Sequence, residues 1–200
     1  MQNIITYLTK RGGFARMKDL RAASFQTRDI AELVCTGKIE KVKPGLYRLP
    51  DIAPHPHLNA SFVEVAHAVP KGIIALASAL AHYELTTFVP SEIFVAIPMA
   101  DKPPKLDYPP VRFFYFPERF YNTGIQEIKT PSTVVRIYNK EKTICDMFRY
   151  RNTLGENLAL EALKNYLHLK DANIRKLHEY AALCRVKSVM LPYLKALVAS

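Results

Sequence analysis

The stretch that decides the fold is TRDIAELVCTGKIEKVKPGLYRLP, residues 27–50. In its first half, Ile30, Leu33 and Val34 recur at the spacing of a helix with one buried face. Gly37 follows, and glycine is the residue that most often ends a helix in the left-handed conformation. The first half therefore predicts a short amphipathic helix that ends just before Gly37.

The second half of the stretch predicts a β-hairpin. Pro44-Gly45 suits the two central positions of a type II turn, because proline fixes the first φ angle and glycine readily adopts a positive φ at the second. Residues 39–43 and 46–49 are therefore expected to pair as the two strands.

Two shorter helical patterns precede this stretch. Residues 4–8 indicate an amphipathic helix that stops at Gly12-Gly13, and a second helix is expected over residues 16–23. Three helices and a two-stranded hairpin within fifty residues are the plan of a winged helix-turn-helix, the architecture of many DNA-binding domains.

The same fifty residues carry concentrated positive charge. They contain ten Lys or Arg against four Asp or Glu, whereas the remaining 150 residues contain eighteen against fourteen. Winged helices also serve as protein-binding modules, and surface cations are often merely solvated. The whole chain has a net charge of +10, of which +6 lies in the first fifty residues, and this distribution favours double-stranded DNA as the partner.

The candidate recognition helix begins near residue 26. In a helix-turn-helix, residues at the start of the second motif helix reach base edges, and flanking cations hold phosphates. Gln26 can pair with adenine and Arg28 with guanine. Asp29 suits the first turn of the helix, whereas Glu32 either faces away from DNA or accepts a hydrogen bond from cytosine. The candidate DNA-binding residues are Lys18, Arg21, Gln26, Thr27, Arg28, Lys41, Lys43 and Arg48.

A second domain is expected after a proline-rich linker. The segment PDIAPHP predicts a linker over residues 51–57, between a domain of residues 1–50 and one of residues 58–200. Helical and β-rich patterns are mixed in the second part, which predicts an α+β fold that ends in helices. Its helices are expected over residues 58–69, around 78–83, and over 140–150, 155–167, 171–183 and 188–198, and its strands over 93–98, 111–116, 125–128 and 134–137.

The sequence offers little that suggests catalysis. Glu127-Ile128-Lys129 has the E-x-K pattern of metal-dependent nucleases, but the upstream aspartates Asp101 and Asp107 lie in a proline-rich loop and make no convincing partner for it. A catalytic metal needs more than one well-placed carboxylate. The chain is therefore expected to be no enzyme, with no catalytic residues, no metal and no cofactor.

The sequence also indicates the cellular compartment of the protein. No apolar run approaches the length of a membrane span, and the first residues lack the pattern of a signal peptide. Cys35, Cys145 and Cys184 are scattered singly and are each expected to be a small buried side chain in a reducing compartment. The sequence thus predicts a cytoplasmic protein that binds no membrane.

Several segments together resemble a known family. They are GGFARMKDLRAA, the stretch quoted at the outset, VPKGIIALASALAHYELT, PSEIFVAIP, and VVRIYNKEKTICDMFRYRNTLGENLALEALKNYL, which cover most of residues 3–170. In this order they resemble the AbiEi antitoxins, transcriptional regulators of type IV toxin–antitoxin systems that act in abortive phage infection. One departure is Ser24-Phe25 in the motif turn, where a glycine is common and where Phe25 is expected to pack under the helix.

The resemblance implies a protein with two functions. The winged helix would repress its own operon by binding inverted repeats in the promoter. The second domain would counter a nucleotidyltransferase-like toxin, without any implied stable complex. The resemblance assigns no antitoxicity residues. An alternative is a stand-alone regulator whose second domain binds a small effector, with residues 113–116 as candidate pocket aromatics.

Overall fold

The computed structural model describes residues 3–51, 58–106 and 108–198. The chain divides into two compact units. Unit 1 comprises Met1–Pro70, Lys102–Val111 and Ile128–Val135, and unit 2 comprises Lys71–Asp101, Arg112–Glu127 and Arg136–Ser200. Of the linker expected over residues 51–57, only Asp51 lies within the described residues.

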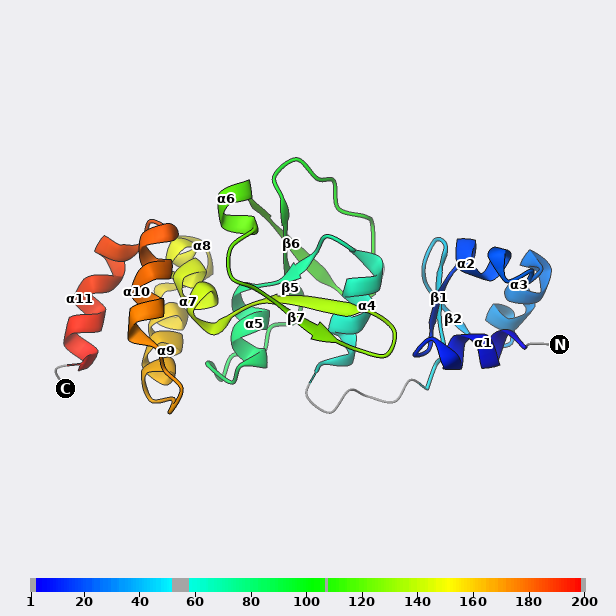
Figure 1. Ribbon diagram of the computed structural model, residues 1–200, viewed down its shortest axis with the longest axis horizontal. Coiled ribbons are helices and arrows are strands. Elements are labelled where there is room, and N and C mark those ends of the chain that lie inside the picture. The colour runs from blue at the N-terminus through cyan, green and yellow to red at the C-terminus, as the bar shows by residue number, and fades with distance from the viewer. Residues whose placement is uncertain (1–2, 52–57, 107, 199–200) are drawn as a thin grey trace. The chain divides into compact units, whose positions relative to one another are not determined.

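Unit 1 opens with three helices and a hairpin, in the predicted order (Figure 1). A short strand that the sequence patterns did not predict joins them, because three residues are too few for a periodicity to show. The elements are α1 (Ile4–Lys10), β1 (Phe14–Arg16), α2 (Met17–Ala22), α3 (Thr27–Cys35), β2 (Glu40–Lys43), β3 (Leu46–Arg48) and α4 (Ala60–Ala68).

The three strands form an antiparallel sheet in the order β1-β3-β2. Gly45 has φ +79°, the value that the second central position of a type II turn requires, so the hairpin turn is as predicted. Its carbonyl accepts a hydrogen bond from the backbone N–H of Met17 at 2.8 Å, which ties the turn to the start of α2.

The core of the winged helix takes side chains from each of its three helices. Leu8, Leu20 and Ile30 are at most 1% exposed and belong to one cluster with Ile39 and Tyr47 of the hairpin region. Full burial of such side chains stabilises a fold by roughly 1.5–3 kcal/mol each. The helix spacing read from the sequence therefore identifies the face that packs.

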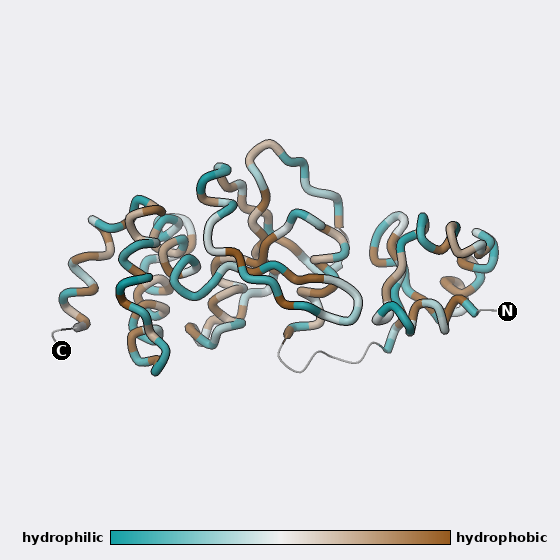
Figure 2. The backbone as a smooth tube through the Cα atoms, in the orientation of Figure 1, coloured by the Kyte–Doolittle hydropathy of each residue, from teal (hydrophilic) through white to brown (hydrophobic). Residues whose placement is uncertain are grey.

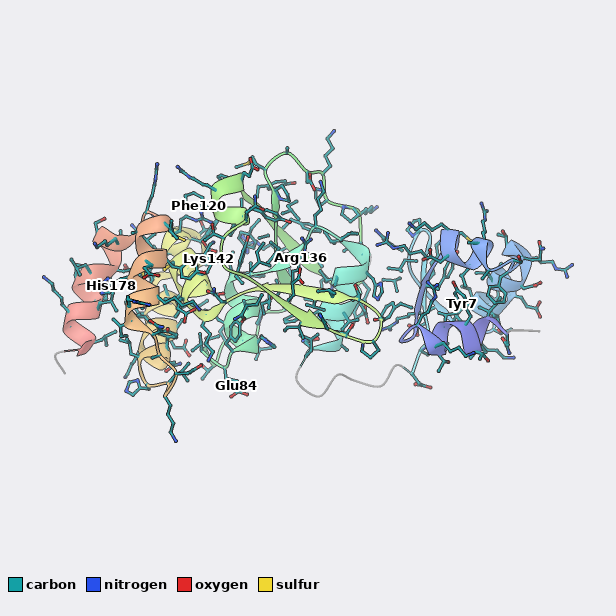
Figure 3. All side chains as sticks on the ribbon, viewed as in Figure 1. Tyr7, Glu84, Phe120, Arg136, Lys142 and His178 are labelled. Carbon is teal, nitrogen blue, oxygen red and sulfur yellow. The ribbon has the colours of Figure 1, made fainter. Side chains whose placement is uncertain are left out.

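The turn between α2 and α3 contains Ser24 and Phe25. Ser24 has φ +65°, a left-handed conformation that favours glycine. Phe25 packs against the core cluster, and its ring meets that of Tyr7 on α1 edge to face, with centroids 5.4 Å apart (Tyr7 is labelled in Figure 3). The expectation that Phe25 packs under the helix is confirmed.

Unit 2 is built on a five-stranded sheet in the order β6-β5-β4-β8-β7, followed by helices. Together with the winged helix this is the predicted α+β class. The short elements β4, α6 and α8 were not predicted, since two to four residues carry no readable period. The elements that lie wholly or mostly in unit 2 are β4 (Ile73–Ile74), α5 (Leu76–His82), β5 (Ile93–Pro98), β6 (Val111–Phe116), α6 (Glu118–Tyr121), β7 (Ile125–Lys129), β8 (Val134–Tyr138), α7 (Lys140–Arg149), α8 (Arg151–Leu154), α9 (Glu156–Leu167), α10 (Ile174–Leu183) and α11 (Lys187–Val198).

Helix α7 lies at the centre of unit 2. It contacts α5, α9 and α10, and its side chains Ile144, Met147 and Phe148 are completely buried. The helices α9–α11 show alternating brown and teal segments in Figure 2, as expected for helices that bury only one face.

Charged side chains of α7 are also buried in this core. Lys142 and Asp146 form a fully buried ion pair, and Arg149 Nη2 lies 3.1 Å from Asp146 Oδ1. Lys142 Nζ lies 4.4 Å from the ring centroid of Tyr138 (Lys142 is labelled in Figure 3). A side chain at Gly124 would place its Cβ 2.7 Å from that of Lys142, so this position requires glycine.

Candidate nucleic-acid interface

The outward face of α3 is polar and exposed. Ile30 is 1% exposed and faces the core, whereas Arg28, Glu32 and Cys35 are all exposed. At 3.6 residues per turn these three positions lie on the side of the helix opposite Ile30. Thr27 begins the helix, and Gln26 is its N-cap residue, with no capping hydrogen bond from its side chain.

Six of the eight candidate DNA-binding residues are exposed. Around the start of α3 the Arg28 side chain is 92% exposed, and its Nε lies 3.8 Å from the carboxylate of Asp29. An exposed pair at that distance contributes little to stability, so the guanidinium is available to a ligand. The six exposed residues are Lys18, Arg21, Gln26, Thr27, Arg28 and Lys41.

The other two candidates have partners inside unit 1. Lys43 is half-buried and its Nζ donates a hydrogen bond to the carbonyl of Ala68, at the end of α4, over 2.6 Å. Burial and the neighbouring Arg16 lower the pKa of Lys43. A cation at a helix C-terminus is favourable because the last carbonyls lack helical partners.

Arg48 bridges two carboxylates. Its Nε donates to Glu40 Oε2 at 2.7 Å, and its Nη1 pairs with Glu64 on α4, a side chain that is only 5% exposed. Burial raises the pKa of Glu64, and the Arg48 guanidinium opposes that rise. Arg48 thus neutralises a buried carboxylate that the local sequence around the hairpin does not reveal.

His67 of α4 makes two further contacts with strand β1. His67 of α4 stacks on Phe14 with centroids 4.2 Å apart, and its backbone carbonyl accepts a hydrogen bond from Arg16 at 3.3 Å. Burial, with a contribution from Arg16, lowers the pKa of His67 to about 4, so its ring is neutral at physiological pH. Sequence reasoning missed Arg16 and α4 as partners, since the contacts join residues about fifty positions apart.

One cysteine prediction was wrong. Cys145 and Cys184 are buried as expected, but Cys35 is exposed. The reason is angular: the core side of α3 is occupied by Ile30, Leu33 and Val34, and Cys35 lies on the opposite face.

The residues considered for catalysis do not converge. Glu127 and Lys129 are exposed on β7, which is an edge strand of the sheet. Asp101 forms an ion pair with Lys71 at 3.0 Å, and Asp107 lies outside the described residues. Within the described ranges, no group of three His, Cys, Asp or Glu side chains is placed to hold a metal ion.

The aromatic strand considered as an effector pocket belongs largely to the core. Phe114 and Phe116 are 7% and 0% exposed and pack in the main cluster of unit 2.

Among the helices that the structure describes, none is both long and apolar enough to span a bilayer.

A winged helix-turn-helix with exposed cations around its second motif helix is the architecture typical of transcriptional regulators. Residues 3–50 match the family model described as "Transcriptional regulator, AbiEi antitoxin", which confirms the resemblance over this segment. No curated protein matches the chain. The resemblance quoted for residues beyond 50 stays a prediction.

Proposed function

We propose that this protein is a DNA-binding autorepressor and the antitoxin of a type IV toxin–antitoxin system. The observation that carries the proposal is the set of exposed residues around the start of α3, within a segment that matches an AbiEi regulator family. Its partners would be inverted repeats in its own promoter and the product of an adjacent nucleotidyltransferase-like gene. The protein would act in the cytoplasm and would catalyse no reaction.

The proposed mode of binding places α3 in the major groove. Gln26 and Arg28 would contact base edges, for which adenine and guanine offer the matching acceptor and donor patterns. Lys18, Arg21 and Lys41 would contact phosphates and release counterions, so affinity would fall steeply as salt rises. We assign DNA binding to residues 1–50 and toxin neutralisation to residues 58–200.

The test of DNA binding uses the full chain and a triple variant, Lys18→Ala/Arg21→Ala/Arg28→Ala. Wild type is expected to bind its own promoter more tightly than a scrambled duplex in fluorescence anisotropy. The variant is expected to lose at least a hundredfold in affinity, because one base contact and two phosphate contacts disappear. Equal affinity of wild type for both duplexes would contradict autorepression.

The antitoxin function is tested by coexpression with the adjacent gene product. If protection resides in residues 58–200, the triple variant rescues growth as well as wild type does, even though it no longer binds the promoter. Absence of any rescue by wild type would instead favour the stand-alone regulator. A variant that folds, as judged by circular dichroism, but loses both functions would contradict the assignment of the two functions to separate domains.

A further inference from the structure

Helix α3 presents one charged residue of each sign at the centre of its outward face. The direction opposite the buried Ile30 falls between Arg28 and Glu32, which are one helical turn apart. Both side chains are exposed, whereas Leu33 and Val34 pack against the core. If α3 enters a groove, Arg28 and Glu32 therefore enter it together.

The carboxylate of Glu32 has no structural role in the part of the chain that the structure describes. Its backbone carbonyl accepts a hydrogen bond from Thr36, but its side chain has no ion pair or hydrogen bond there. Glu32 is the sixth residue of a helix that begins at Thr27, beyond the first turn in which an acid is stabilised by the helix dipole. Asp29, by contrast, lies in that first turn.

A carboxylate at this place is costly for DNA binding of the ordinary electrostatic kind. Phosphates repel it, and in the major groove it is also repelled by the acceptors O6 and N7 of guanine and O4 of thymine. The N4 amino group of cytosine is the donor that a carboxylate side chain characteristically accepts from. A carboxylate is thus favoured opposite cytosine and disfavoured opposite guanine and thymine, while adenine offers an N6 amino donor beside the repelling acceptor N7.

We infer that Glu32 is a specificity-determining residue that selects cytosine in the major groove and weakens binding to sequences without it. This inference rests on the proposed function, in which α3 lies in that groove. Arg28, one turn away, would supply the attractive contact to guanine. Specificity would then come from a favourable contact and an unfavourable one on the same helix face.

The experiment selects sequences from a duplex library with a randomised core, using the full-length chain. Wild type is expected to enrich cytosine at one position, with a preference on the order of ten- to a hundredfold, the range of one good base contact. Glu32→Ala is expected to lose that preference and to bind the unselected library several-fold more tightly. Glu32→Gln is expected to change the preference to adenine, which an amide reads through N6 and N7.

The matched control is Glu118→Gln, which removes the same charge from an exposed position on α6. It is expected to keep the wild-type preference, so that a general charge effect is distinguished from a base contact. Thermal melting followed by circular dichroism should be the same for all four proteins, because both glutamates are exposed.

The proposed function and the role of Glu32 are contradicted by different outcomes of this selection. If wild type retains no duplex from the library, the proposed function itself is overturned. If wild type selects a sequence but the Glu32→Ala protein selects the same one, or if no cytosine is enriched, the inference about Glu32 is overturned and the proposed function stands.

Discussion

Two regions of this protein place charged side chains in opposite environments. At the start of α3 in unit 1, the Arg28 side chain is 92% exposed. In α7 of unit 2, Lys142 and Asp146 are completely buried and face each other. Burial, rather than residue type, separates charges that are available to a partner from charges that hold a core together.

The α7 cluster depends on a single anion between two cations. Asp146 pairs with Lys142 and with Arg149, whose guanidinium also lies 4.2 Å from the ring centroid of Phe120. A buried ion pair adds little net stability compared with apolar residues of the same size. Removal of one partner, however, leaves a buried charge without compensation.

The largest effect is therefore expected for Asp146→Ala. It leaves two cations in the core without their anion, which should lower the free energy of unfolding by about 3–5 kcal/mol. Urea denaturation followed by circular dichroism measures the change, with a separate transition for each unit where the units unfold independently. The control Glu179→Gln breaks an exposed pair with Arg175 and should leave the curve unchanged. Equal curves for both variants would contradict the prediction and show that the buried pair adds no net stability to the folded state.

A smaller effect is expected for Arg48→Ala in unit 1. The buried carboxylate of Glu64 loses its cation, which should destabilise unit 1 by about 2 kcal/mol at neutral pH, less than a fully buried pair because Arg48 is partly exposed. The sign of the pH dependence follows from Glu64, whose pKa is raised above its ordinary value of 4.5.

A raised carboxyl pKa favours the folded state at low pH, where Glu64 is neutral, and the benefit disappears as pH rises through that pKa. The Arg48→Ala deficit should consequently shrink as pH falls through the raised pKa of Glu64. Thermal melting of both proteins from pH 7.5 downward measures it, and the double variant Arg48→Ala/Glu64→Gln should show no such dependence. A deficit that is constant with pH would mean that Glu64 is not the group that Arg48 neutralises.

Much of the fold could be read from the sequence because its longer elements have clear periods. The strands over residues 93–98 and 111–116 have the predicted bounds. The long helices begin and end within about three residues of their own predicted bounds. Strand β4 escaped prediction although it lies in the middle of the sheet. Two apolar residues ahead of a helix show no alternation. Their pairing with β5 and β8 joins segments that are distant in the sequence, so no local pattern indicates it.

The candidate interface also contains residues whose environment could be predicted from the sequence and residues whose environment could not. The exposure of Arg28 follows from helix geometry, since it lies opposite Ile30 in a stretch with a clear period. The positions of Lys43 and Arg48 do not, because Lys43 and one end of the Arg48 guanidinium find their partners on α4, which begins only at Ala60. A positive charge in a hairpin does not indicate whether its ligand is a phosphate or a carbonyl of the same chain.

The smallest effect tells a phosphate ligand from a carbonyl ligand for two lysines of one strand. Lys41 is exposed, whereas Lys43 donates to the carbonyl of Ala68. Lys41→Ala should therefore make the negative slope of log affinity against log salt less steep by about 0.9, the contribution of one phosphate contact. Lys43→Ala should leave the slope unchanged. Promoter binding titrated by fluorescence anisotropy at several salt concentrations gives both slopes from proteins of equal net charge. An equal loss of slope in both variants would mean that Lys43 releases Ala68 when DNA binds, and that the contact with α4 competes with the phosphate for the same ammonium group.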